Sequence, residues 1–341
     1  MCKKYYLRDI CVGENYNAGT KAVIDVNAVL ETKAYSALPV CLSNNAHKSK
    51  WWRLIMSLYS MLKMLFTLKK GDIVFVQYPY YIHRAFIAAY YRILYWKQVK
   101  IQLLIHDLNS LRNENGQKEN DILTRAEVVV CHTPRMKDIL QRQGVQEAKI
   151  RILYLFDYIT DVSNNYKSDY ENRVVFAGNM SKSKFLTELP KVHNVDFLLY
   201  GLPAIQDEIG ENVHYIGKFA ANDIADIKGD WGLVWDGNSL DTCTGLMGKY
   251  LAVNSSHKIS LYIASEKPVI VWEESSLKDF IINNHLGISV KSLHEIADKI
   301  ASISDEDKNI MTASLKHFSQ KLKKGEMLGD IIAALENHTI Q

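Results

Sequence analysis

A lysine stands in the first turn of a predicted helix in the second half of the chain. The stretch NSSHKISLY (residues 254–262) offers Ser255 or Ser256 as a helix N-cap, and apolar residues follow at helical spacing. Free backbone N–H groups and the helix dipole favour an anion at such a point. With Lys258 added, the site suits a phosphate or diphosphate, and we predict that it holds a nucleotide-linked donor.

Two further lysines follow another predicted strand. RVVFAGN (residues 173–179) is mostly apolar and ends in a Gly-Asn turn, and MSKSK (residues 180–184) places Lys182 and Lys184 where the next helix should begin. Backbone amides and two cations at this point would form a second anion site facing the same ligand. A solvated basic turn explains this stretch equally well.

A histidine and an aspartate come directly after a third apolar run. VKIQLLI (residues 99–105) is a predicted buried strand, and His106 and Asp107 lie at its carboxyl end, where parallel α/β sheets bind ligands. This position suits proton transfer, with Asp107 as the base and His106 assisting or orienting it. Alternatively, Asp107 caps the next turn and His106 is a satisfied polar residue beside the sheet.

The elements that position these residues alternate along the chain. Short apolar runs separated by loops and helical stretches indicate βαβ units and mostly parallel sheets. We predict two doubly wound Rossmann-like domains facing across a cleft. Residues 1–156 would bind the acceptor, 157–172 form a polar linker, 173–318 bind the donor, and 319–341 form a terminal helix that can pack back on the first domain.

The first predicted strand, at residues 4–10, leads into a glycine-containing loop, GENYNAG (residues 13–19). The loop lacks the G-x-G-x-x-G pattern, so it gives little support to dinucleotide binding. We place Tyr16, Asn17 and Gly19 on the acceptor side of the site. An ordinary surface loop is the alternative.

Composition excludes several classes of protein. The length of 341 residues fits two domains, and a net charge of +3 gives no support to nucleic-acid binding. Five scattered cysteines without a Cys-x-x-Cys pair predict reduced thiols rather than a disulfide framework or a zinc site. The chain has neither a signal-peptide core nor a run of ~18 uncharged apolar residues, so we expect a cytoplasmic protein.

Two stretches of the first half mix apolar, aromatic and basic residues. WWRLIMSLYSMLKMLFTL (residues 51–68) includes Arg53 and Lys63, and residues 78–100 contain six tyrosines, one tryptophan, two arginines and two lysines. Such mixtures suit a membrane interface, although both stretches could be helices that pack on the first sheet. We predict peripheral contact with the anionic inner face of the cytoplasmic membrane. Homo-oligomerisation is left open.

Longer stretches carry a resemblance to a known family. They are GLVWDGNSLDTCTG (residues 232–245), YL (250–251), NSSHKISLY (254–262), PVIVW (268–272), IHDL (105–108), FAGN (176–179) and DFIINNHLG (279–287). In their order and spacing, the sequence resembles the bacterial β-1,6-galactofuranosyltransferases of O-antigen assembly. It is more distantly similar to the streptococcal glucosyltransferases that extend glycans on serine-rich adhesins.

The resemblance implies a GT-B glycosyltransferase that uses a UDP-sugar donor and a lipid-linked oligosaccharide acceptor. It implies donor contacts at Asn179, Lys182, Asp236, Tyr250, His257 and Lys258. The family pattern Asn-Asn-Pro-His-Lys is Asn-Ser-Ser-His-Lys here, which retains the lysine. The Glu-x7-Glu pair of many retaining GT-B enzymes is missing at its expected offset.

A UDP leaving group develops negative charge, which a metal or fixed positive groups must stabilise. The only Asp-x-Asp, Asp305 to Asp307, lies in the helical tail, so we expect no metal and no cofactor. We predict inverting transfer of galactofuranose, β-1,6 to a glucosyl residue, in surface polysaccharide synthesis. The alternatives are a UDP-glucose-dependent glucosyltransferase of the same fold and a non-catalytic bilobed nucleotide- or sugar-binding protein.

Overall fold

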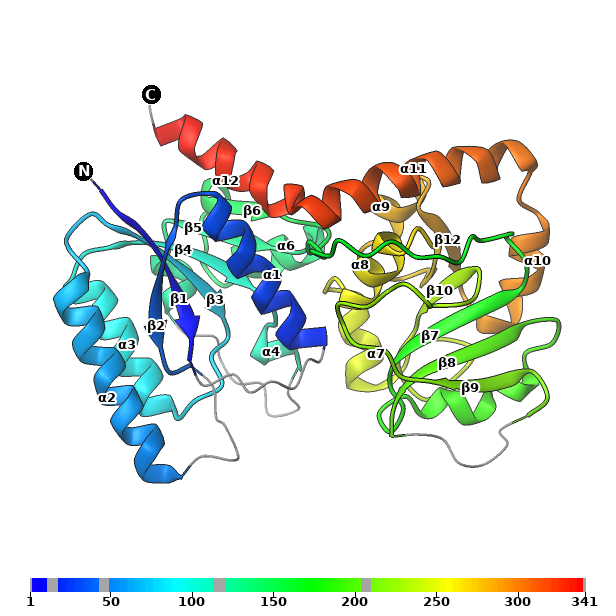
Figure 1. Cartoon of the computed structure of the whole chain (residues 1–341), viewed down its shortest axis with the longest axis horizontal. Coiled ribbons are helices and arrows are strands. Elements are labelled where there is room, and N and C mark those ends of the chain that lie inside the picture. The colour runs from blue at the N-terminus through cyan, green and yellow to red at the C-terminus, as the bar shows by residue number, and fades with distance from the viewer. Residues whose placement is uncertain (1, 11–17, 43–48, 113–120, 204–209, 340–341) are drawn as a thin grey trace. The chain divides into compact units, whose positions relative to one another are not determined.

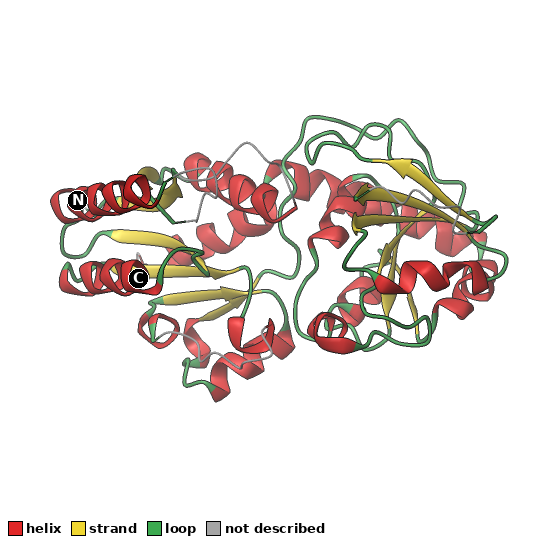
Figure 2. Cartoon of the chain, turned by 90° about the horizontal axis from the view of Figure 1, so that it is seen from below, coloured by secondary structure: helices red, strands yellow, loops and turns green. Residues whose placement is uncertain are grey.

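The computed structural model describes residues 2–10, 18–42, 49–112, 121–203 and 210–339 (Figure 1). The chain divides into two compact units. The first comprises Met1–Tyr16, Val23–Leu153 and Leu328–Gln341, and the second comprises Asn17–Ala22 and Tyr154–Met327. Helices flank the strands in both (Figure 2).

The first unit contains a parallel six-stranded sheet in the order β2-β1-β3-β4-β5-β6. The strand order reverses between β1 and β3, as in flavodoxin-like folds. The strands are β1 (Lys4–Asp9), β2 (Ser36–Val40), β3 (Ile73–Tyr78), β4 (Lys100–Ile105), β5 (Val128–Cys131) and β6 (Ile150–Ile152). The central strands are almost wholly buried, because helices cover both faces of the sheet.

The helices around this sheet have recognisable start signals. In α6, Thr133 is the N-cap, its hydroxyl accepts from the Met136 N–H at 3.1 Å, and Pro134 occupies the first turn. The helices are α1 (Ala18–Thr32), α2 (Lys50–Thr67), α3 (Arg84–Trp96), α4 (Asn109–Arg112), α5 (Ile122–Arg125), α6 (Pro134–Arg142) and the short 3-10 helix η1 (Glu147–Lys149).

The second unit contains a parallel six-stranded sheet in the order β12-β11-β10-β7-β8-β9. This is the strand order of a dinucleotide-binding Rossmann domain, and it reverses between β7 and β10. The strands are β7 (Arg173–Asn179), β8 (Asp196–Leu202), β9 (Val213–Gly217), β10 (Trp231–Val234), β11 (Val269–Trp272) and β12 (Gly287–Val290).

The helices of the second unit include the C-terminal α11, whose ends carry complementary charges. Asp305 and Asp307 lie in its first turn and three lysines in its last, and Gly325 ends it in the left-handed region at φ 73°. The helices are the 3-10 helix η2 (Lys184–Lys191), α7 (Gly245–Leu251), α8 (His257–Ala264), α9 (Lys278–Asn283), η3 (Leu293–Glu295), α10 (Ile296–Ala301) and α11 (Asp305–Lys324).

The last helix, α12 (Glu326–Thr339), returns the chain to the first unit from Leu328 onward. Leu328 and Ile332 are buried, and Glu336 forms an ion pair with Lys4 of β1. Residues 319–327, which the sequence grouped with this helix, belong to the second unit.

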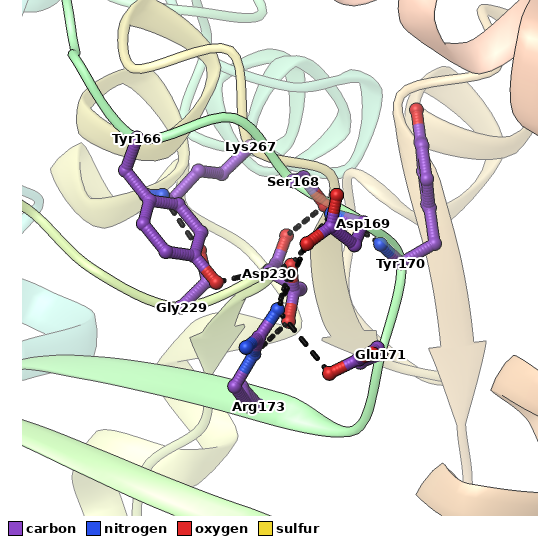
Figure 3. A network of polar contacts seen from close by, with 9 residues as sticks. All are labelled: Tyr166, Ser168, Asp169, Tyr170, Glu171, Arg173, Gly229, Asp230 and Lys267. Atoms are coloured by element: carbon purple, nitrogen blue, oxygen red, sulfur yellow. Dashed lines mark hydrogen bonds and ion pairs between the residues drawn. The ribbon is translucent and has the colours of Figure 1, made fainter.

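Residues 157–172, expected to be a linker, are part of the second unit. Asp230, fully buried just before β10, accepts hydrogen bonds from the Asp169 N–H at 2.8 Å and from Arg173 Nε at 2.7 Å (Figure 3). The buried amine of Lys267 donates to the Gly229 carbonyl at 2.6 Å and lies 4.5 Å from the centre of the Tyr166 ring. These contacts hold the polar segment against the amino ends of β7, β10 and β11.

The structure bears on two further expectations. No helix among the described residues is long and apolar enough to cross a membrane. Cys41 is disulfide-bonded, whereas Cys2, Cys131 and Cys243 are free. The expectation of reduced thiols is therefore wrong for Cys41, because scattered spacing along the chain does not reveal which thiols meet in space.

Candidate active site

The strands β7 and β10 separate toward their carboxyl ends, at the reversal point of the second sheet. They pair through Trp231 with Val174 and Gly232 with Val175, and no further along. Beyond these pairs the hydroxyl of Tyr262, from α8, bridges the strands. This hydroxyl accepts a hydrogen bond from the Ala177 N–H at 2.8 Å and donates one to the Leu233 carbonyl oxygen at 3.3 Å. A doubly wound sheet binds its ligand at such an opening.

Helix α8 begins beside this opening. Ser256 is its N-cap, and the Ser256 hydroxyl accepts from the Lys258 N–H at 3.4 Å. Lys258 Nζ lies 3.9 Å from the Asp236 carboxylate and 4.5 Å from the centre of the Phe176 ring. Lys258 Cε lies 3.1 Å from the position that a Cβ on Gly178 would occupy. The lysine therefore extends from the start of α8 to the ends of both strands, past a glycine.

The charge of Lys258 is only partly balanced. Its side chain is 18% exposed, and burial lowers the pKa of its amine below the usual value, while Asp236 opposes that shift. The Asp236 carboxylate stands beyond hydrogen-bond distance, at 3.9 Å. A desolvated cation with one distant partner is suited to bind a diphosphate, which would supply closer acceptor oxygens.

Asn179 and Lys182 lie at the exposed end of β7. The Asn179 side-chain oxygen accepts from the Lys182 N–H at 3.2 Å and from the Ser181 hydroxyl at 2.7 Å, which closes the turn. Gly178, next to Asn179, is the residue that Lys258 passes. The structure thus brings this turn and the Asp236–Lys258 pair to the same edge of the sheet.

Tyr250 is buried and His257 is half-buried, and both also contact other parts of the second unit. Tyr250 is buried in α7, and the His257 ring packs on Phe156 with 4.2 Å between ring centroids. These contacts give both residues a role in supporting α7 and α8.

His106 and Asp107 follow β4 in the first unit. His106 Nε2 lies 2.8 Å from Gln77 Oε1, and Gln77 Nε2 donates to Asn27 Oδ1 at 2.8 Å. In this network the amide oxygen accepts, so Nε2 of His106 carries the proton and Nδ1 is the acceptor of the neutral ring. Asp107 Oδ2 accepts from the Tyr81 hydroxyl at 3.4 Å. A carboxylate and an imidazole of fixed tautomer are suited to take up a proton.

The structure gives little information on the three predicted acceptor-side residues. Tyr16 and Asn17 lie outside the described residues, and Gly19 is in the first turn of α1. The residues described contain no group of three or more His, Cys, Asp or Glu side chains that could hold a metal ion. His106 and Asp107 belong to the first unit, and the predicted donor residues belong to the second.

Sequence reasoning did not single out Gln77 or Tyr262. Gln77 is a polar residue near the carboxyl end of the otherwise apolar strand β3. A polar residue at that position could have been predicted from the sequence as a site residue. Tyr262 follows Lys258 by one helical turn and was assigned only to the apolar face of α8, because sequence does not show that its hydroxyl reaches two strands.

Two family models match the chain. The glucosyltransferase 3-like N-terminal domain matches residues 4–155, and the glucosyltransferase 3-like C-terminal domain matches residues 174–335. The chain belongs to the glucosyltransferase 3-like family. This membership makes the protein a glycosyltransferase, as the resemblance of its motifs implied.

Individual proteins agree with this placement. This chain is 29% identical over 342 residues to the β-1,6-galactofuranosyltransferase WbbI of Escherichia coli K12, covering 96% of this chain and 97% of WbbI. It is 26% identical over 263 residues to glucosyltransferase 3 of Streptococcus gordonii, covering 75% and 76% of the two chains. The structure of Anabaena Alr3699/HepE, solved with UDP and glucose, matches with a TM-score of 0.58 at 13% identity, over 99% and 100%. The predicted GT-B class, with two Rossmann-like domains, is confirmed.

Proposed function

We propose that this glycosyltransferase moves galactofuranose from UDP-galactofuranose to the 6-hydroxyl of a glucosyl residue. The acceptor would be a lipid-linked oligosaccharide in surface polysaccharide synthesis, and the new linkage β. The similarity to WbbI over 96% of the chain supports the choice of sugar and linkage. The position of Lys258 at the reversal point of a Rossmann sheet supports a UDP-sugar donor.

The donor diphosphate would bind at the start of α8. Its oxygens would accept hydrogen bonds from the free N–H groups of the first turn and from Lys258 Nζ. The exposed Lys182 and the turn at Asn179 would extend the same anion site. The Asp236 carboxylate, beside Lys258, would partly balance the positive charge of the empty anion site before the donor binds.

The transfer would proceed by a single displacement with inversion. The 6-hydroxyl oxygen of the acceptor attacks the anomeric carbon of the donor, its proton passes to Asp107, and the bond from the anomeric carbon to the diphosphate oxygen breaks. UDP leaves with that electron pair, and Lys258 stabilises the charge that grows on the diphosphate. His106, held by Gln77, would orient Asp107 or the acceptor hydroxyl.

We propose that this stabilisation needs no metal ion and that the enzyme uses no cofactor. Lys258, Lys182 and the start of α8 would supply the positive charge that a cation provides in other transferases. Turnover should be undiminished in excess chelator. Loss of turnover that only Mn²⁺ or Mg²⁺ restores would contradict this part of the proposal.

A second donor, UDP-glucose, is favoured by a separate observation. The streptococcal glucosyltransferase 3 proteins match about three quarters of the chain, and both family models carry the glucosyltransferase name. The Lys258 site would bind either donor, because Lys258 would contact the diphosphate and not the sugar.

Donor screening separates these two functions. The full-length protein is incubated with UDP-galactofuranose, UDP-galactopyranose or UDP-glucose and a glucosyl acceptor, and the linkage of the product is read by NMR. We expect a β-1,6-linked galactofuranosyl product. A glucosyl product alone would favour the second donor, and binding of UDP without turnover of any UDP-sugar would favour the non-catalytic alternative.

A further inference from the structure

The outward face of α2 consists of large apolar side chains. Six of them are exposed and form what is here called the α2 stripe: Trp51, Ile55, Leu58, Tyr59, Leu62 and Phe66. Their spacing of three, four and seven residues places them along one side of the helix. Phe66 is 85% exposed and Trp51 76%. A surface helix normally buries such a face.

The inward face of α2 carries two buried serines and one buried methionine, and hydrogen bonds hold it in place. The buried residues of the helix are Ser57, Ser60 and Met64. The Ser60 hydroxyl donates to the Met56 carbonyl at 2.7 Å and accepts from the Cys41 N–H at 2.8 Å. Turning the helix to bury the stripe would break the contact with Cys41 and remove the acceptor of the buried Cys41 N–H. The hydrogen bond between Ser60 and Cys41 therefore fixes the outward orientation of the stripe.

The surroundings of the stripe are basic. Every charged residue of α2 and of α3 is a lysine or an arginine, and further lysines follow both helices at positions 69, 70, 97 and 100. Helix α3 packs beside α2 and exposes Arg84, Arg92 and Trp96 (Figure 1). The net charge of the whole chain is only +3, so this bias is local.

We propose that the α2 stripe and the basic residues of α2 and α3 dock the first unit onto an anionic lipid surface. Helix α2 would lie in the plane of the membrane, with Trp51, Tyr59 and Phe66 at the level of the headgroups. The exposed cations would neutralise anionic headgroups around it. Charge complementarity favours this occupant over a second copy of the chain, because two such basic faces repel each other.

The proposal does not depend on the identity of the donor, and its test needs no turnover. The full-length protein is mixed with vesicles of phosphatidylglycerol and phosphatidylcholine, or of phosphatidylcholine alone, and the bound fraction is measured by co-sedimentation. We expect binding to the anionic vesicles that weakens as salt is raised toward about 1 M. Vesicles containing brominated lipid should quench tryptophan fluorescence, and Trp51→Ser should reduce that quenching, with Trp96 of α3 retaining a part of it.

Three variants separate the contributions. Trp51→Ser with Phe66→Ser should lower the partition coefficient by about tenfold or more, because two large apolar groups no longer insert. Arg84→Gln with Arg92→Gln should lower it by about fivefold for each charge removed. The matched control, Ile310→Ser, changes an exposed apolar residue of the second unit and should leave binding unchanged. All the altered side chains are exposed, so thermal midpoints should stay near that of the parent chain.

Three results would overturn the proposal. The first is no binding to anionic vesicles, and the second is binding that the stripe variant leaves intact. The third is a lipid-free dimer, seen by light scattering, that Trp51→Ser with Phe66→Ser dissociates. That result would assign the stripe to a second copy of this chain.

Discussion

Replacing Lys258 by methionine should weaken UDP binding without unfolding the protein. Methionine keeps much of the apolar stem that passes Gly178 and contacts Phe176, and it removes the charge. Burial already lowers the pKa of Lys258, so the folded apo protein gains little from this cation. We therefore expect the thermal midpoint of the apo variant to be unchanged or slightly higher.

The size of the effect follows from the charges in the site. At 3.9 Å, the distance between Lys258 Nζ and the Asp236 carboxylate, two unit charges interact by about 4 kcal/mol at an effective dielectric of about 20. A diphosphate oxygen at a comparable distance would gain a similar attraction and lose hydration, which leaves a net contribution of about 1.5–3 kcal/mol. The dissociation constant for UDP should therefore rise by about 10- to 150-fold.

Isothermal titration calorimetry with UDP measures this change directly. Lys249→Met, at an exposed lysine of α7, is the matched control and should leave the dissociation constant within about twofold. Adding Asp236→Asn to Lys258→Met should recover part of the affinity, because it removes a carboxylate that would repel the diphosphate. A stable Lys258→Met protein that binds UDP as tightly as the parent chain would refute the reasoning.

Three further changes test other parts of the structure. Gly178→Ala places a methyl group 3.1 Å from both Lys258 Cε and Phe176 Cζ, so UDP affinity measured by calorimetry should fall, and the thermal midpoint should fall too because the Phe176 ring is buried; unchanged affinity would contradict the placement of Lys258. Gln77→Glu puts a carboxylate beside His106 and should move the acidic limb of the kcat/KM profile to higher pH; a profile that does not move would count against a role for His106. Burial lowers the pKa of Lys267 to about 7, so between that pH and about 10.4 the unfolded chain holds a proton that the folded chain lacks. Relative to Lys267→Met, the free energy of unfolding measured in urea should therefore rise with pH across this window by up to a few kcal/mol; parallel pH profiles would disagree with a buried, neutral amine.

The sequence alone predicted the parts of the site that depend on local order. Serine caps followed by a lysine in the first turn marked the start of α8, and an apolar run ending before His106 marked the carboxyl end of β4. These features recur wherever a parallel strand is followed by a helix, so pattern and resemblance were sufficient.

The parts that the sequence did not predict depend on residues far apart in the chain. Asp230 lies 57 residues from Arg173, and nothing in the polar segment 157–172 shows that a buried carboxylate will hold it. The outward direction of the α2 stripe was equally hidden, because the contact of Ser60 with Cys41 spans 19 residues and comes from another element. Tertiary contacts, rather than local propensity, decide both features.

The return of α12 to the first unit affects the order in which this protein can fold during synthesis. Leu328, Ile332 and Glu336, the partner of Lys4, follow the second unit in the sequence, although they complete the unit that holds β1. The residues before Tyr154 can therefore cover the surface that α12 occupies only after the second unit has been synthesised.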